Sequence, residues 1–391
     1  MSTGLVSSSR SSALILVLAI AAGLVLSQKK TIFALAADTP GDSSSSVSCT
    51  FYISPSGSDE KPGTLAEPWK TVQKAFDTAT PGQTVCLRGG TYPESVLPDP
   101  MTKAATQLEK QSGTPGNPIV FTNYPGEVAI IQGETKIYGS YITLRGATQS
   151  AKSCSARNQC GLVFERTDTV PYASDIDILN SSGPGFVIID HVEIRNAPYH
   201  AGVYQEGCNN AIVGSYVHDN GLQNRNEDNG IYWSVTPSDC KNGGLIADNL
   251  VEHNYSKGIQ LYAGASASTP AYVTVCGNIS VNNGSVGAVI WGDHNTFVGN
   301  ILYNNNEIAT AAAGAQAGLY SGTANFVDHN LTWSTSDRSG KRSDWYVKKG
   351  CCLKNNLIAD PLFLDPAHPN WDLRPSSQAK DWTSRVCPKL P

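Results

Sequence analysis

Short runs of alternating apolar and polar residues, divided by Asn and Gly, fill the second half of the chain. One glycine recurs at intervals of 28 to 31 residues, and its copies are Gly202, Gly230, Gly258, Gly287 and Gly318. A row that ends in asparagine precedes each glycine, and these residues are Asn196, Asn220, Asn254, Asn283 and Asn305. A third short apolar run precedes each row. Three short strands per repeat, separated by Asn and Gly turns, indicate a solenoid of stacked coils.

Stacking gives the repeated residues a physical role. Strands of successive coils lie about 4.8 Å apart, so equivalent side chains fall in columns. We expect the five asparagines to form ladders in which each amide satisfies the next. We expect each glycine to supply either a positive φ or room for a close backbone approach.

Strand alternation sorts the side chains of the asparagine rows into columns. The first column predicted to point inward is Val192, Tyr216, Leu250, Ile279 and Ile301. The second is Ile194, His218, Glu252, Val281 and Tyr303. His218 and Glu252 would then be neighbours, either as an activated acid–base pair or as a hydrogen-bonded pair in or near the core. The outward column is predicted to hold Arg195, Asp219, His253, Asn282 and Asn304.

The glycine rows predict two further outward columns, which are rich in aromatic residues. One holds Tyr204, Tyr232, Gln260, Val289 and Tyr320, and the other Glu206, Ser234, Tyr262, Trp291 and Gly322. Exposed Tyr and Trp along a solenoid suit the apolar faces of sugar rings. The alternatives are that loops cover these rings, or that a register one residue off makes them core.

One turn between the rows is enlarged. "GLQNRNEDN" separates Asn220 from Gly230, six residues more than "YSK" or "GSV" in the coils that follow. This insertion brings acidic, basic and amide side chains close to Lys257 of the next coil and His200 of the previous one. Loops that bulge from a regular scaffold often carry binding chemistry, although a plain polar insertion is equally consistent with the pattern.

The ends of the chain have a different composition. Residues 1–37, with Arg10 and the apolar run "ALILVLAIAAGLVLS", are predicted to be a signal peptide, with a retained anchor as the alternative. A Ser-rich tether follows at 38–48, and 49–391 is predicted to be one domain. Within "WKTVQKAFDTA", Val72, Ala75, Phe76 and Ala79 share one helical face, which would close the end of the solenoid.

Ten cysteines in an exported chain favour disulfides over a metal site. Proximity suggests Cys49–Cys86, Cys154–Cys160 and Cys208–Cys240. The formal net charge of −5 offers no basic surface for nucleic acid.

Three segments extend the pattern into a family resemblance. They are "FYISPSGSDEKPGTLAEPWKTVQKAFDTATPGQTVCLRGGTYPE" (Phe51 to Glu94), "SGTPGNPIVFTNYPGE" and "IADPLFLDPAHPNWDLRPSSQAKDW". Together with the repeats they resemble the right-handed parallel β-helix superfamily typified by pectate lyases, from about Phe51 to Trp382. The resemblance implies an all-β parallel β-helix of three short strands per coil, with an N-terminal cap at about 51–94 and a C-terminal cap at about 351–391. Lyases, hydrolases, epimerases, binding proteins and phage adhesins share this architecture.

The first mechanistic hypothesis is β-elimination on an extracellular uronate polysaccharide. Lyases of this superfamily use a Lys or Arg base, and the resemblance therefore points to Lys257, flanked by Tyr232 and Tyr262. Arg195 and His253 are further catalytic candidates. The candidates for substrate binding are Tyr204, Tyr232, Gln260, Tyr262, Trp291 and Arg225. Asp219, Glu227 and Asp228 offer the oxygen ligands that Ca²⁺ prefers.

Two other classes of function stay open. A glycoside hydrolase would need paired carboxylates, for which Glu206 with Asp228 or Asp219 with Asp228 are the candidates. A glycan-binding protein would use the aromatic columns without catalysis. We expect a secreted monomer without an organic cofactor, with no membrane contact once the signal peptide is removed.

Overall fold

A computed structural model describes most of the chain beyond its N-terminal segment. The described residues are 48–97, 112–146, 154, 156, 159–168, 173–180, 183–222, 227–234, 243–262, 271–305, 315–320, 322, 324–336, 345–347, 353–367, 370–380 and 382. The signal peptide and most of the tether lie outside them. Gly41–Cys387 forms one compact unit. Within the described part of the chain, no helix is long and apolar enough to cross a membrane.

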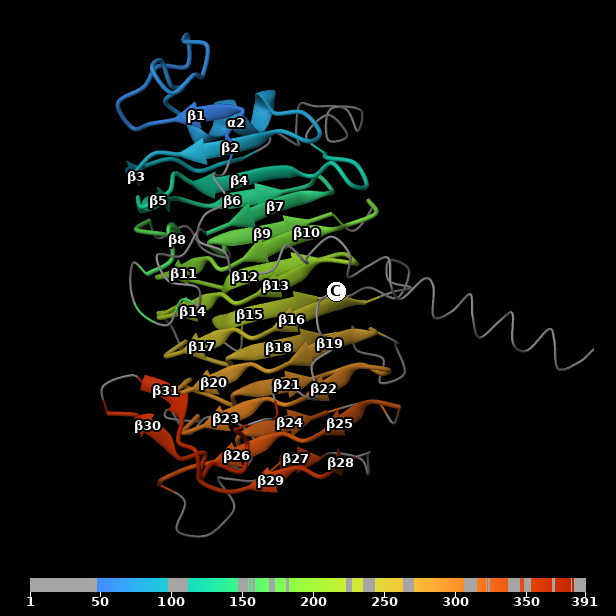
Figure 1. Cartoon of the computed structure of the whole chain (residues 1–391). Helices are drawn as coiled ribbons and strands as arrows, with labels where there is room; N and C mark the ends of the chain where they lie inside the picture. Colours follow the sequence, from blue (N-terminus) through green and yellow to red (C-terminus); the bar gives the residue numbers. More distant parts are fainter. Residues whose placement is uncertain are drawn as a thin grey trace, which may run out of the picture. The chain divides into compact units, whose positions relative to one another are not determined.

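Three parallel sheets run along this unit, one strand per coil in each (Figure 1). Sheet A has eleven strands. They are β1 (Phe51–Ile53), β2 (Thr84–Leu87), β4 (Ile119–Asn123), β7 (Ile142–Arg145), β10 (Val187–Asp190), β13 (Ala211–Val213), β16 (Gly244–Ala247), β19 (Val273–Cys276), β22 (Thr296–Val298), β25 (Phe326–Asp328) and β28 (Leu353–Lys354). In its central part, each strand pairs in parallel with the strand three places further along the sequence, which is the topology of a coil.

Sheet B contains the asparagine rows and has ten strands. They are β3 (Gly90–Tyr92), β5 (Ala129–Gln132), β8 (Leu162–Glu165), β11 (Glu193–Arg195), β14 (Tyr216–His218), β17 (Leu250–Glu252), β20 (Ile279–Val281), β23 (Ile301–Tyr303), β26 (Leu331–Trp333) and β29 (Leu357–Ile358).

Sheet C contains the glycine rows and has eight strands. They are β6 (Thr135–Ile137), β9 (Ile176–Leu179), β12 (Ala201–Glu206), β15 (Asn229–Ser234), β18 (Ile259–Tyr262), β21 (Ala288–Ile290), β24 (Ala317–Leu319) and β27 (Trp345–Val347). The expected right-handed parallel β-helix with three short strands per coil is therefore confirmed.

Asparagine ladders connect the coils, as expected for four of the five residues. Asn220, Asn254, Asn283 and Asn305 form one ladder, in which each Nδ2 donates to the next Oδ1 at 2.8 to 3.0 Å. A second ladder, not foreseen from the sequence, joins Asn249, Asn278, Asn300, Asn330 and Asn356 at 2.9 Å per step. Buried amides that satisfy one another cost little to bury, so the ladders hold the coils in register.

Four of the five recurring glycines serve this first ladder through close approach rather than through positive φ, whereas Gly318 lies against the ring of Tyr320. A Cβ on Gly202 would lie 2.6 Å from Asn220 Nδ2, and a Cβ on Gly230 would lie 2.7 Å from Asn254 Nδ2. Neither glycine has a positive φ. Any larger residue at these positions would therefore collide with the amide stack.

The predicted placement of Asn196 in the ladder is wrong by one residue. Glu193, not Val192, lies opposite Tyr216, so Arg195 lies opposite His218. Asn196 instead has the positive φ shared by Asp219 and His253. The Ala197 amide donates to Asn220 Oδ1 at 3.0 Å in its place. The row was misaligned because an asparagine occupies the left-handed position, which asparagine also tolerates.

The predicted inward columns of sheet B are also wrong in the coils that follow β11. In each of these strands the middle residue, and not the two that flank it, points into the main core. These middle residues are Val217, Val251 and Leu302, and they continue the column of Ile194. Tyr216, Leu250, Ile301, Val281 and Tyr303 belong instead to a second apolar cluster, with Cys154, Cys160, Phe363 and Trp371. Both faces of sheet B are buried, so the apolar pattern alone does not reveal which face is inside.

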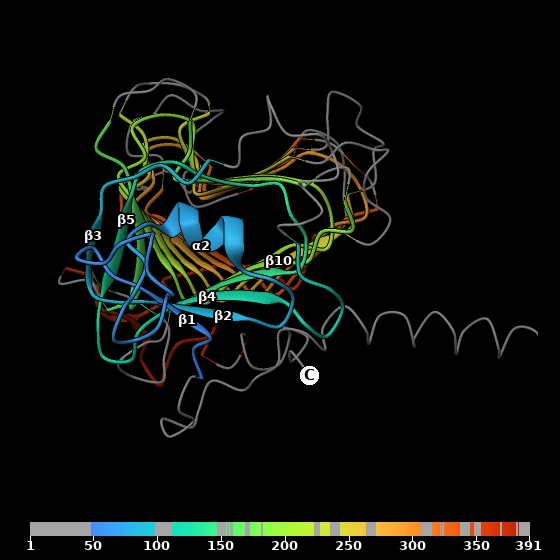
Figure 2. The ribbon, with the colours of Figure 1, turned by 90° about the horizontal axis from the view of Figure 1, so that it is seen from above.

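The two ends are closed by different elements. Helix α2 (Val72–Thr78) begins after Thr71, whose side chain accepts a hydrogen bond from Lys74 N at 3.1 Å. Seen from above, it lies across the interior of the first coils (Figure 2). It buries Val72, Ala75 and Phe76, as the pattern predicted. At the other end, β30 (Phe363–Asp365) and β31 (Asn370–Leu373) form an antiparallel pair.

The expected disulfides Cys49–Cys86 and Cys154–Cys160 are present. Cys208 and Cys276 are also disulfide-bonded. Cys240, the expected partner of Cys208, lies outside the described residues.

Candidate functional site

The outer face of sheet C carries a continuous row of aromatic side chains. Val203, Ile231 and Ile259 point into the main core, so the residues that alternate with them face outward. The aromatic row consists of Tyr204, Tyr232, Tyr262, Trp291, Tyr320 and Tyr346. Successive ring centroids lie 5.1 to 6.4 Å apart, and every ring is half-buried. The outward direction predicted for these rings is confirmed, but the predicted column of Tyr320 is wrong: Gly318 lies opposite Val289, and Tyr320 stacks on Trp291.

Lys257 lies in the turn that leads into β18, beside this row. Its backbone N–H donates to Asn229 Oδ1 at 3.2 Å, which fixes the turn. Burial lowers the pKa of the Lys257 ammonium to about 8, and the nearby carboxylate of Glu227 opposes that shift only in part. The neutral, basic form of Lys257 is therefore more populated near neutral pH than that of an ordinary lysine.

His200 lies at the same face, although its importance was not foreseen from the sequence. Its ring centroid is 4.6 Å from that of Tyr204 and 5.5 Å from that of Tyr232. Its Nδ1 is 2.9 Å from the Oγ of the fully buried Ser174. Burial lowers the pKa of His200, with the carboxylates of Glu227 and Glu206 acting in the opposite direction. His200 is two residues before Gly202, as Asp228 is before Gly230, and this spacing is the signal that could have identified it.

The side chains around Lys257 and His200 have defined partners. Tyr204 Oη donates to Glu206 Oε1. Asp228 is fully buried, and its Oδ1 accepts from the backbone N–H of His200 at 3.0 Å. Gln260 is buried, and its Oε1 accepts from Asn229 Nδ2 at 3.2 Å. Gln260 therefore belongs to the wall of the site rather than to its open face.

An acidic group continues this face toward the N-terminal coils. Lys136 lies opposite Asp177, and Asp177 lies opposite Tyr204, so the three form one outward column. Burial raises the pKa of Asp177 to about 7, and a hydrogen bond with Glu134 adds to the effect. Lys136 Nζ is 2.9 Å from Glu134 Oε1.

Two of the three residues predicted to hold Ca²⁺ have hydrogen-bond partners of their own. Asp219 Oδ2 is paired with His218 Nδ1 at 2.8 Å on sheet B, whereas Asp228 is bonded to His200 N. Among the residues that the structure describes, no three His, Cys, Asp or Glu side chains form a group that can hold a metal ion.

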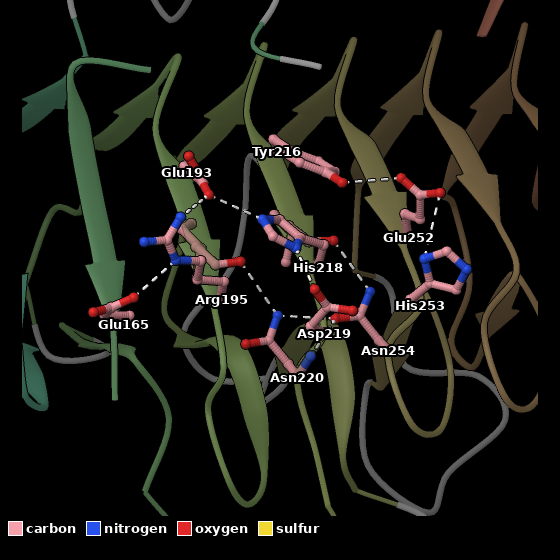
Figure 3. Close-up of polar contacts among 12 residues, drawn as sticks. Glu165, Glu193, Arg195, Tyr216, His218, Asp219, Asn220, Glu252, His253 and Asn254 are labelled. Carbon is pink, nitrogen blue, oxygen red and sulfur yellow. Dashed lines mark hydrogen bonds and ion pairs between the residues drawn. The ribbon is translucent and has the colours of Figure 1, made fainter. Parts of the chain in front are cut away.

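Arg195, the second catalytic candidate, is not beside Lys257. It lies buried on the outer side of sheet B, where its Nε donates to Glu165 at 2.8 Å and its Nη1 to Glu193 (Figure 3). Because of the one-residue shift of β11, Arg195 lies opposite His218 and not, as predicted, opposite Asp219. A guanidinium that bridges two carboxylates inside a covered layer braces coils against each other.

His218 continues the same buried chain of charges. Its Nε2 is 3.1 Å from Glu193 Oε1, and its Nδ1 faces Asp219 (Figure 3). Burial lowers the pKa of His218, but the hydrogen bonds to Asp219 and Glu193 outweigh it and raise the pKa above its ordinary value. The two carboxylates therefore favour the protonated form of His218.

Glu252 has different partners from those predicted. Its Oε2 accepts from Tyr216 Oη at 3.0 Å, and its Oε1 is 3.4 Å from Nδ1 of His253, whose side chain is 46% exposed. The predicted His218–Glu252 acid–base pair is therefore replaced by separate buried contacts. His253, the third catalytic candidate, lies at the edge of this layer and not at the aromatic row. Arg225 and most of the enlarged turn lie outside the described residues.

Comparison with known proteins gives a family match over most of the chain. The model of the Pel9A-like, right-handed beta helix region matches residues 51–340. "Pectate lyase PEL9" of Emericella nidulans is 42% identical over 83 residues, which are 21% of this chain and 18% of that protein. The uncharacterized protein YwoF of Bacillus subtilis (strain 168) is 40% identical over 92 residues, 24% of this chain and 17% of that protein. Each match spans less than a fifth of the relative's own length.

One solved structure supports the fold independently. The crystal structure of pectate lyase Pel9A aligns with a TM-score of 0.50 and 14% identity, over 88% of this chain and 94% of that one. At this identity the likeness concerns the fold alone.

Proposed function

The chain belongs to the Pel9A-like right-handed β-helix family, and we propose that it is a polysaccharide lyase that cleaves a uronate polymer by β-elimination. The observation that carries the proposal is the position of Lys257, a partly buried amine with a pKa of about 8, at the aromatic row. The name of its relative, a pectate lyase, makes pectate the first polymer to test.

Lys257 is suited to the first chemical event. Its neutral Nζ takes the proton from the carbon next to the uronate carboxylate. Burial disfavours the charged ammonium form of Lys257, so part of the amine is neutral and able to accept a proton. Tyr232 and Tyr262 on the flanking strands offer their ring faces to the sugars on either side.

The uronate carboxylate also needs a positive neighbour when the carbanion forms. We predict that this positive neighbour is either a Ca²⁺ ion held by Glu227 and its neighbours or the guanidinium of Arg225. Lyase assays with Ca²⁺ and with a chelator decide between them.

Secretion is part of the same proposal. Two disulfides and the further disulfide-bonded cysteines suit an oxidising compartment, as does an extracellular polymer as substrate.

Hydrolysis by paired carboxylates has less support. Asp228, a member of both candidate pairs, is fully buried and accepts from a backbone N–H. A carboxylate in that position does not face a sugar on the aromatic row.

The test is the ultraviolet absorbance of the unsaturated product, followed with purified protein on pectate, alginate and glycosaminoglycans. We expect absorbance to rise on a uronate polymer, and Lys257→Ala to abolish the rise. Lys354→Ala, a matched change on the exposed strand β28, should retain full activity. If Lys257→Ala kept full activity, another base would be at work. If no polymer gave product but one bound, the protein would be a glycan-binding member of the family.

A further inference from the structure

The corner where the chain leaves sheet C and enters sheet A carries a further group of aromatic side chains. One backbone position at this corner has a positive φ in six successive coils, just before the strand of sheet A. Strand pairing puts these residues in register along the solenoid. They are Tyr141 (φ 56°), Phe186 (64°), Asn209 (59°), Gly243 (68°), Tyr272 (53°) and His294 (57°), and we call them the corner column.

Tyr and Phe are unusual residues at such a position. At the corresponding positions of the other two corners, the residues with a positive φ are all Asn, Asp, His or Gly, which adopt this conformation most readily. They are Asn196, Asp219, His253, Asn282 and Asn304 at one corner, and His191, Gly214, Asp248, Gly277, Gly299, His329 and Asn355 at the other. A bulky ring at a positive φ costs free energy, so local backbone preference does not explain Tyr141, Phe186 and Tyr272.

The rings of the corner column form two pairs. The centroids of Tyr141 and Phe186 are 4.8 Å apart with their planes at 9°, and both residues are half-buried. The centroids of Tyr272 and His294 are 5.2 Å apart. Tyr272 is 42% exposed, and the side chain of His294 is 46% exposed. Burial can therefore offset the backbone cost in the first pair, but it does not account for the exposed ring of Tyr272.

The exposed pair adjoins the aromatic row. Trp291 of the row is three residues before His294, and a glycine and Asp293 join them. The carboxylate of Asp293 is turned to the backbone, where its Oδ1 accepts from the N–H groups of His294 at 3.0 Å and Ala324 at 2.6 Å. Because these bonds hold the carboxylate against the backbone, the Tyr272–His294 pair presents its rings to solvent beside the row.

We propose that the corner column is a second binding surface for the polysaccharide, whose exposed rings stack on sugars of the same polymer. Its ring spacings of 4.8 and 5.2 Å are close to those of the aromatic row, 5.1 to 6.4 Å, because the coil spacing sets both. A polymer whose sugar faces fit the row therefore also fits the corner. The inference rests on the proposed function for the identity of the polymer, a uronate polysaccharide, and it needs no catalytic step.

Two binding surfaces on one protein change how it holds a long substrate. A long chain contacts the row and the corner together, so its second contact forms at a high effective concentration. A short oligosaccharide occupies only the row, next to Lys257. The corner column should therefore strengthen the binding of polymers and leave the binding of short oligosaccharides unchanged.

The first experiment measures binding by calorimetry in the Lys257→Ala background, which leaves the ligand intact. The ligands are pectate and its trisaccharide, with alginate and glycosaminoglycans in their place if pectate does not bind. We expect Tyr272→Asn to weaken polymer binding about 3–10-fold, as for the loss of one stacking ring, and to leave trisaccharide binding unchanged. Trp291→Ala should weaken both, and Leu364→Asn, at a leucine of β30 that is 44% exposed, should weaken neither. Unchanged polymer binding by Tyr272→Asn, or no binding of any of these polymers, would overturn the inference.

The second experiment separates a binding role from a structural one. Asn209 shows that the fold accepts asparagine at this backbone position, so Tyr272→Asn should unfold at the same urea concentration as its parent or at a higher one. A lower urea midpoint, together with equally weakened binding of polymer and trisaccharide, would make Tyr272 structural and overturn the inference. Product formation is a separate readout. A protein that binds the polymer through Tyr272 but releases no unsaturated product would lose the lyase proposal and keep the second surface.

Discussion

Removing one amide from the first asparagine ladder should destabilise the fold by several kcal/mol. Asn254 is 1% exposed, and its side chain is bonded on both sides. Its Oδ1 accepts from the Nδ2 and the backbone N–H of Asn220, and its Nδ2 donates to Asn283 Oδ1 and to Val217 O. In Asn254→Ala the backbone N–H of Asn220 is left buried without its acceptor.

The magnitude follows from the bonds. A buried donor without a partner costs about 1–3 kcal/mol, and each remaining lost bond costs about 1 kcal/mol. Asn254→Ala should therefore lower the free energy of unfolding by about 4–6 kcal/mol.

Urea unfolding followed by circular dichroism measures the change, with an unchanged m-value as the sign that both states are comparable. The control is Asn370→Ala, at an exposed asparagine whose Oδ1 accepts one bond from Asp372 N at 3.1 Å. We expect that control to change stability by less than about 1 kcal/mol. If Asn254→Ala were no more destabilising than the control, the ladders would not hold the coils together.

Three further predictions concern pH and the aromatic row. On the polymer kcat/KM should rise with pH through a midpoint near pH 8, because Lys257 accepts a proton only when its amine is neutral, and a profile that is flat through this range would contradict Lys257 as the base. Trp291→Ala should raise KM about 3–10-fold with little change in kcat, as expected for the loss of one stacking ring, and a fall in kcat with KM unchanged would contradict that role. The pKa of His218 is raised in the folded state, so its contribution to stability is complete below about pH 6.5 and is lost as pH rises through the folded pKa. The free energy of unfolding of His218→Gln should therefore lack this pH dependence. If it varied with pH as steeply as that of the wild-type protein, His218 would not be the source.

The periodicity of the chain was sufficient to predict the fold. Asparagine and glycine recur once per coil because amide ladders and close backbone approaches recur once per coil. The capping helix was predictable from its one apolar face. The aromatic row was predictable because sheet C has one open face, so alternation separates its outer side chains from the core.

Sheet B could not be interpreted in the same way. Its outer face is covered by the second apolar cluster, so His218 and Glu252 are buried without being inside the solenoid. A left-handed position that accepts Asn, Asp or His equally well then allowed β11 to be aligned one residue off. These two features explain why Arg195 was predicted to share an outward column with Asp219 and His253, although it lies opposite His218.

The contact between His200 and Ser174 was missed for another reason. Ser174 is neither aromatic nor charged, and only the folded coil brings it against the imidazole. The spacing before the repeated glycine places His200 in the turn, but no sequence pattern indicates the partner of its Nδ1.

The most direct test of the central claim is the mass of the oligosaccharides released from pectate and other uronate polymers. A lyase gives products with an unsaturated terminal sugar, each one water lighter than the hydrolytic product of the same length. We predict the lighter series for the wild-type protein and no release by Lys257→Ala. The heavier series would show hydrolysis and contradict β-elimination at Lys257.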